Sequence, residues 1–191
     1  DILSKTANSQ YMLINFLEGP FLAFLLSYLV KFFSTESGPD AKYLFRYNEN
    51  ISAYIFISIV VALFMGLTVS AEEIISDRKI LKRETFLNLS RFSYLSSKAT
   101  IMIIISAIQT ISYILVGNLI LGINGMFLDY WLVLFSCSLF ANMLGLNISS
   151  AFNSVVTIYI LIPILLIPQL LLSGVIVKFD KLNPASVSYT H

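Results

Sequence analysis

Five long apolar stretches, separated by short polar segments, make up most of this 191-residue chain. A helix needs about 20 mostly apolar residues to cross the hydrocarbon core of a bilayer. The stretches show no alternation of period two, which argues against a β-barrel, and backbone groups in lipid must then pair within helices. We therefore predict an all-α membrane protein with one bundle of transmembrane helices, at about residues 11–33, 51–70, 99–121, 127–149 and 154–177.

The composition supports a membrane protein and excludes several kinds of chemistry. Hydrophobic residues make up 57% of the chain and charged residues 12%, whereas a soluble domain is about one quarter charged. The one histidine is His191 and the one cysteine is Cys137. We therefore expect no internal disulfide, no metal site and no catalytic residue in this chain, and lipids rather than nucleic acid around it.

Half of the twelve Lys and Arg residues lie in one segment, between the second and third apolar stretches: Arg78, Lys79, Lys82, Arg83, Arg91 and Lys98. The next connection, "GINGM", has none. Short loops rich in Lys and Arg face the cytoplasm. We therefore expect a multi-pass protein of the cell membrane (a bacterial inner membrane or a plasma membrane) with its N-terminus in the cytoplasm. On this interpretation alone the basic segment is a topology anchor.

The basic segment has features beyond its charge. "VSAEEIISDRKI" contains no Gly or Pro, so we expect the second helix to continue past the membrane. Apolar and basic side chains then fall on opposite sides of this extension. "NLS" at 88–90 predicts a break, with Ser90 or Ser93 capping the next helix. A short helix held below the membrane indicates docking on a soluble protein, although a basic amphipathic helix can also lie on anionic lipid.

Two motifs in this chain are similar to motifs of a known family. "SAEEIISDRKILKRE", then "SYLSSK" and a long apolar span, resemble the permease domain of G-subfamily ABC exporters, which move pigment precursors, sterols and drugs and have bacterial relatives. "LLSGVIVKFDKLNP" resembles the outer end of their fifth span. The family has six spans, and this sequence has five and no G-x-x-x-x-G-K-[ST] motif. We expect the sixth span and the ATPase to lie outside it.

The resemblance implies roles for residues at the cytoplasmic side. A coupling segment at about residues 78–92 would contact a nucleotide-binding domain, through Arg78, Lys79, Lys82, Arg83 and Glu84. A polar relay between the second and third spans would include Glu72 and Glu73. Lys98 or Arg91 would be the partner of Glu72 in that relay.

The resemblance also implies a transport path. Two copies of the permease would face each other around a central cavity lined by Ala62, Met65, Pro163 and Ile167. Val175 and Ile176 would form a hydrophobic valve at its outer end. The function implied is ATP-driven export of an apolar or amphipathic substrate. ATP and Mg²⁺ would bind the associated nucleotide-binding domain, and this chain would bind no cofactor.

Glu18 is a carboxylate within the first apolar stretch, where a charge is costly and often functional. One interpretation places it inside the bundle, paired with a polar group or relaying protons. The other has Gly19–Pro20 break the chain, so that Glu18 lies near water. Two further functions stay open: an ion-coupled secondary transporter using Glu18, and a non-transporting scaffold that docks a partner through the basic segment.

Overall fold

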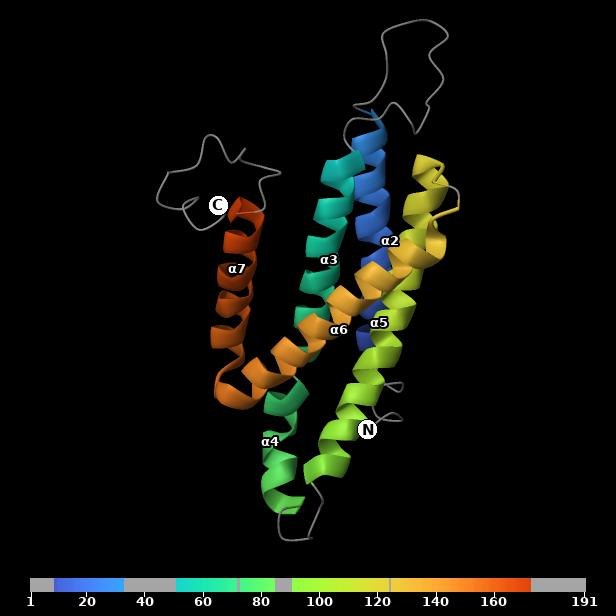
Figure 1. The fold of residues 1–191 in the computed structure, drawn as a ribbon. Coiled ribbons are helices and arrows are strands. Elements are labelled where there is room, and N and C mark those ends of the chain that lie inside the picture. Colours follow the sequence, from blue (N-terminus) through green and yellow to red (C-terminus); the bar gives the residue numbers. More distant parts are fainter. Residues whose placement is uncertain (1–8, 33–50, 72, 85–90, 124, 173–191) are drawn as a thin grey trace, which may run out of the picture.

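The computed structural model describes residues 9–32, 51–71, 73–84, 91–123 and 125–172, and Figure 1 shows their arrangement. Within these residues the chain is helical and contains no strand. The helices are α2 (Ser9–Phe32), α3 (Ile51–Ala71), α4 (Glu73–Glu84), α5 (Arg91–Leu121), α6 (Phe127–Ala151) and α7 (Val155–Leu172). The predicted all-α fold is confirmed.

Four helical stretches are long and apolar enough to cross a membrane: Leu13–Lys31, Ile51–Arg78, Phe92–Leu121 and Phe127–Ala151. The fifth, α7, is apolar but shorter within the described residues, and the predicted span continues to residue 177, outside them. The predicted extension of the second span is present as α4, which follows α3 after residue 72. The predicted break at 88–90 lies outside the described residues, between α4 and α5.

Helices α2 and α5 run side by side in the same direction. Gln109 Nε2 donates a hydrogen bond of 3.1 Å to the carbonyl oxygen of Asn15, and further along, Gly117 packs near Ser27. Helix α2 continues through Pro20 without ending. The proposed chain break at Gly19–Pro20 is therefore wrong, because the backbone of α5 packs directly against Gly19 and supports the helix there.

Helices α3 and α6 also run in the same direction, and α6 crosses α3 obliquely in Figure 1. Small residues allow their backbones to approach closely. A Cβ atom on Gly66 would meet the main chain of Ser138, and a Cβ atom on Gly145 would meet the side chain of Ser70. Close approach of this kind is the usual basis of helix association in lipid, where no hydrophobic force drives helices together.

Polar side chains join α5 to α6 inside the bundle. Asn142 Nδ2 donates to Ser106 Oγ at 2.7 Å, and Ser138 Oγ donates to the same oxygen at 2.9 Å. Trp131 Nε1 donates to Thr110 Oγ1 at 3.2 Å. The buried amide of Asn142 and these hydroxyls therefore act as contacts between helices.

Helix α5 is longer than the membrane is thick. Its 31 residues extend about 46 Å at 1.5 Å per residue, against about 30 Å of hydrocarbon. Near its far end Leu119 is 81% exposed, as expected of a side chain that faces lipid. At its Arg91 end α5 runs beside α4 (Figure 1).

Candidate functional site

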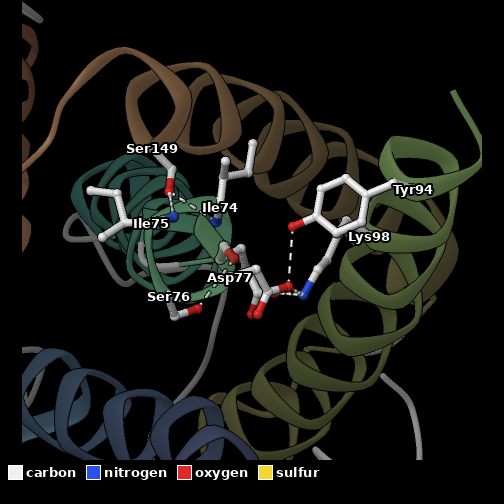
Figure 2. A network of polar contacts seen from close by, with 8 residues as sticks. Ile74, Ile75, Ser76, Asp77, Tyr94, Lys98 and Ser149 are labelled. Carbon is white, nitrogen blue, oxygen red and sulfur yellow. Dashed lines mark hydrogen bonds and ion pairs between the residues drawn. The ribbon is translucent and has the colours of Figure 1, made fainter. Parts of the chain in front are cut away.

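The start of α4 is capped by a side chain from another helix. The first N–H groups of any helix lack partners within it. Here Ser149 of α6 is fully buried, and its Oγ accepts hydrogen bonds from the backbone N–H groups of Ile74 at 3.0 Å and Ile75 at 3.2 Å (Figure 2). Ser149 therefore serves the purpose of an N-cap residue while belonging to α6.

On the opposite side, α4 is joined to α5 by ionic contacts. Lys98 Nζ lies 2.6 Å from Asp77 Oδ2 and 3.1 Å from Glu73 Oε2. The hydroxyl of Tyr94 donates a hydrogen bond of 3.1 Å to the same oxygen of Asp77 (Figure 2). Glu73 and Asp77 are four residues apart on α4, as Tyr94 and Lys98 are on α5, so each pair presents one face to the other helix.

The positive charge of Lys98 is compensated by the groups around it. The side chain of Lys98 is 1% exposed, and a buried ammonium is stable only with good ionic partners. Two carboxylates face it, and one of them, Glu73, lies in the first turn of α4, where the helix dipole stabilises negative charge. The ring of Tyr94 lies 5.7 Å from Nζ and adds a cation–π contact.

Arg78, the residue after Asp77 on α4, binds the end of α6. Its Nη2 donates to the carbonyl oxygen of Ser150 at 2.8 Å and to that of Phe152 at 2.9 Å. Its Nη1 donates to Asn153 Oδ1. The last carbonyl groups of a helix lack partners within the helix and carry partial negative charge. The guanidinium of Arg78 supplies both the donors and the positive charge that this helix end lacks.

The structure shows contacts for some of the predicted relay and coupling residues. Glu73 contacts Lys98, whereas Glu72 lies outside the described residues. Arg78 contacts its own chain rather than facing away from it. The remaining predicted docking residues lie on the helical backbone of α4, beyond Arg78: Lys79, Lys82, Arg83 and Glu84.

Sequence reasoning missed Asp77, Ser149 and Asn153. A signal existed for Asp77, because its spacing of four from Glu73 matches that of Tyr94 from Lys98. No comparable signal identifies Ser149 or Asn153, since their contacts depend on where α6 ends relative to α4.

The predicted cavity residues do not share one surface. Ala62 and Met65 are fully buried in the core of the chain, beside Tyr113 and Leu134. On α7, by contrast, Pro163 is exposed and Ile167 is 51% exposed. Val175 and Ile176 lie outside the described residues. The roles of all these residues in a cavity or valve stay predictions.

Glu18 lies well inside the first membrane helix. The next residue, Gly19, packs against the carbonyl of Gln109, which follows Lys98 by 11 residues, or about 16 Å along α5. The side chain of Glu18 is partly exposed. Among the residues that the structure describes, no cluster of His, Cys, Asp and Glu side chains could hold a metal ion.

Comparison with known proteins identifies the family. The family model described as ABC-2 type transporter matches residues 1–191. No curated protein and no solved structure matches the chain. The match spans the whole chain, and the apolar helices agree with it. The chain therefore belongs to the ABC-2 type transporter family, as a multi-pass permease domain.

Proposed function

We propose that this permease moves an apolar or amphipathic substrate out of the cytoplasm or the inner leaflet, driven by ATP hydrolysis on an associated nucleotide-binding domain. The observation that carries the proposal is the attachment of α4. Family membership supports an ATPase partner of this kind. Helix α4 lies beyond the membrane helices and is joined to α5 through Lys98 and to α6 through Arg78. A force applied to α4 would therefore act on both membrane helices.

The docking surface in this proposal is the second half of α4. Lys79, Lys82 and Arg83 carry positive charge there, and Glu84 ends the helix. Basic residues suit an acidic surface on the ATPase domain. Arg78 has a different role, because its guanidinium is already bonded to the end of α6.

The proposal includes the orientation and a second copy of the permease. Loops rich in Lys and Arg face the cytoplasm, which would place α4 and the start of α2 there. Two copies would enclose a path along α7, where Pro163 and Ile167 are exposed. Val175 and Ile176 would close its outer end. The scarcity of charged side chains in the spans favours an apolar or amphipathic substrate.

The test uses the full transporter with its ATPase domain in lipid vesicles. The probe is a phosphatidylcholine with a fluorescent short acyl chain, and its movement between leaflets is measured with and without ATP. We expect ATP-dependent movement that orthovanadate stops. A panel of amphipathic dyes serves as a second set of probes. ATP hydrolysis that no probe stimulates, together with no ATP-dependent movement, would contradict export of apolar substrates.

An ion-coupled secondary transporter is the second candidate, favoured by the position of Glu18 inside a membrane helix. It predicts transport that is driven by a proton gradient in the absence of ATP. It also predicts that Glu18→Gln abolishes this transport. In the ATP-driven proposal the same variant retains ATP-dependent transport, so one pair of assays separates the two functions.

A further inference from the structure

We infer that Arg78 and Ser149 are positioning residues that make the corner between α6 and α7 follow α4 when the ATPase moves it. The corner consists of residues 149–155. This inference rests on the proposed function and adds a second route for the movement, separate from the contact of Lys98 with Asp77. Its consequence is that α7, which starts at Val155, responds directly to a displacement of α4.

The first support is that two contacts hold α4 and the end of α6 in one register. Ile74 pairs with Ser149 and Arg78 pairs with Asn153, and both pairs are separated by 75 residues. The two contacts are four residues apart on each chain segment, which is one helical turn on α4; on the other segment Asn153 lies just past the end of α6 at Ala151. A single contact allows one helix to pivot on the other, whereas two contacts in register resist both rotation and sliding.

The second support is that the contacts involve the backbone. Ser149 binds the backbone N–H groups of α4, and Arg78 binds the backbone carbonyl groups of Ser150 and Phe152. Flexible side chains at both ends of a contact would absorb part of a displacement. With the main chain at one end of every contact except that of Arg78 with Asn153, less of the movement is lost before it reaches the corner.

The third support is that the same offset of 75 residues recurs where α3 packs against α6. Gly145 packs against Ser70, and these residues are again 75 apart. Gly66 is in contact with Ser138 and Ala141. Tightly packed helices shift as blocks because their interfaces are not continuously deformable. Helices α3, α4 and α6 therefore form one block, which we call the α3–α4–α6 block.

Helix α7 is positioned to follow this block. Ile158, Ile162 and Leu166 of α7 are buried against Leu67, Ala71 and Ala141 of the block. Three residues connect α6 to α7 in the corner, since α6 ends at Ala151 and α7 begins at Val155. A displacement of the corner therefore shifts the base of α7, the helix that carries the exposed Pro163 and Ile167.

The experiment measures the movement of α7 by electron–electron double resonance in the full transporter. One spin label per copy is placed at Val156, which is 67% exposed at the base of α7. A separate sample carries it at Phe92, which is 80% exposed at the start of α5. The distance between the labels of the two copies is compared between nucleotide-free and vanadate-trapped states.

We expect both distances to change in the parent protein. In Arg78→Ala/Ser149→Ala the change at Val156 falls by about half or more, whereas the change at Phe92 persists because Lys98 still binds Asp77. Arg78→Lys keeps a cation with fewer donors and gives an intermediate result. Ser150→Ala is the matched control and has no effect, since Arg78 bonds the backbone carbonyl of Ser150 and not its hydroxyl.

The single variants Ser149→Ala and Asn153→Ala are measured as well, in case the double variant folds poorly. Each is expected to reduce the change at Val156 by a smaller amount. An undiminished change at Val156 in all these variants would overturn the inference, and so would a parent protein in which only Phe92 moves. A parent protein without ATP hydrolysis would instead contradict the proposed function itself.

Discussion

Lys98 Nζ and Asp77 Oδ2 lie 2.6 Å apart although they belong to different helices, and the side chain of Lys98 is 1% exposed. The contact joins the first half of α4 to the early part of α5. A cation at this depth would be unstable without its acidic partners. The pair therefore attaches the short helix α4 to α5, a helix long and apolar enough to cross a membrane.

Replacing Lys98 with Met should destabilise the protein strongly. Removing one member of a buried ion pair leaves the other charge uncompensated, at a cost of about 3–5 kcal/mol. Here both Glu73 and Asp77 would lose their cation. The measurement is the fraction of monodisperse protein after heating in detergent, followed by size exclusion. Lys98→Arg retains the charge and should lie closer to the parent; equal stability of Lys98→Met and the parent would contradict the interpretation.

Alanine should be tolerated less well at Gly66 than at Gly145. A Cβ atom at Gly66 would meet the backbone of Ser138, which cannot move without shifting α6, whereas at Gly145 it would meet the side chain of Ser70. Overpacking of this kind costs about 1–3 kcal/mol. The same heating assay compares the two variants. Ser70→Ala should partly restore Gly145→Ala, and the reverse order of stability would show that the helices separate more easily than their packing indicates.

Reversing two charges on α4 should weaken attachment of the ATPase domain. We expect Lys79→Glu/Lys82→Glu to reduce its affinity for the permease about tenfold, because each exposed contact contributes up to about 1 kcal/mol and repulsion is added. Co-purification over a range of salt concentrations gives the affinity. Lys178→Glu, at the far end of the fifth predicted span, is the control. If the variant loses binding to anionic lipid vesicles but keeps the ATPase domain, the helix lies on the membrane instead.

A cysteine at position 176 tests the proposed valve. In a symmetric dimer a patch on the axis meets its own copy, so Ile176→Cys should crosslink to the same residue of the second copy in the resting state. The crosslink is detected as a dimer on a non-reducing gel. Cys137 is first replaced by Ser, so that one thiol remains per copy. Labelling by a lipid-phase maleimide without any crosslink would place Ile176 against lipid.

The sequence by itself determined the helical fold and where two of the spans begin. Long apolar stretches predict spans because every backbone group in lipid must be paired within a helix. The predicted starts at residues 51 and 127 match α3 and α6, and the absence of Gly and Pro after Val69 predicts the helical continuation as α4. These properties depend on composition and local spacing, and both can be read directly from one chain.

The tertiary structure decided which polar groups meet. The sequence predicted Lys98 or Arg91 as the partner of Glu72, which lies outside the described residues, and it did not predict that Lys98 contacts Glu73 and Asp77. Which carboxylates face Lys98 depends on how α4 is rotated about its own axis relative to α5. The sequence likewise assigned Arg78 to an outside partner, whereas the position of α6, set by close packing at Gly66 and Gly145, brings the end of α6 to Arg78. Contacts between residues 75 positions apart depend on helix packing, which local spacing does not specify.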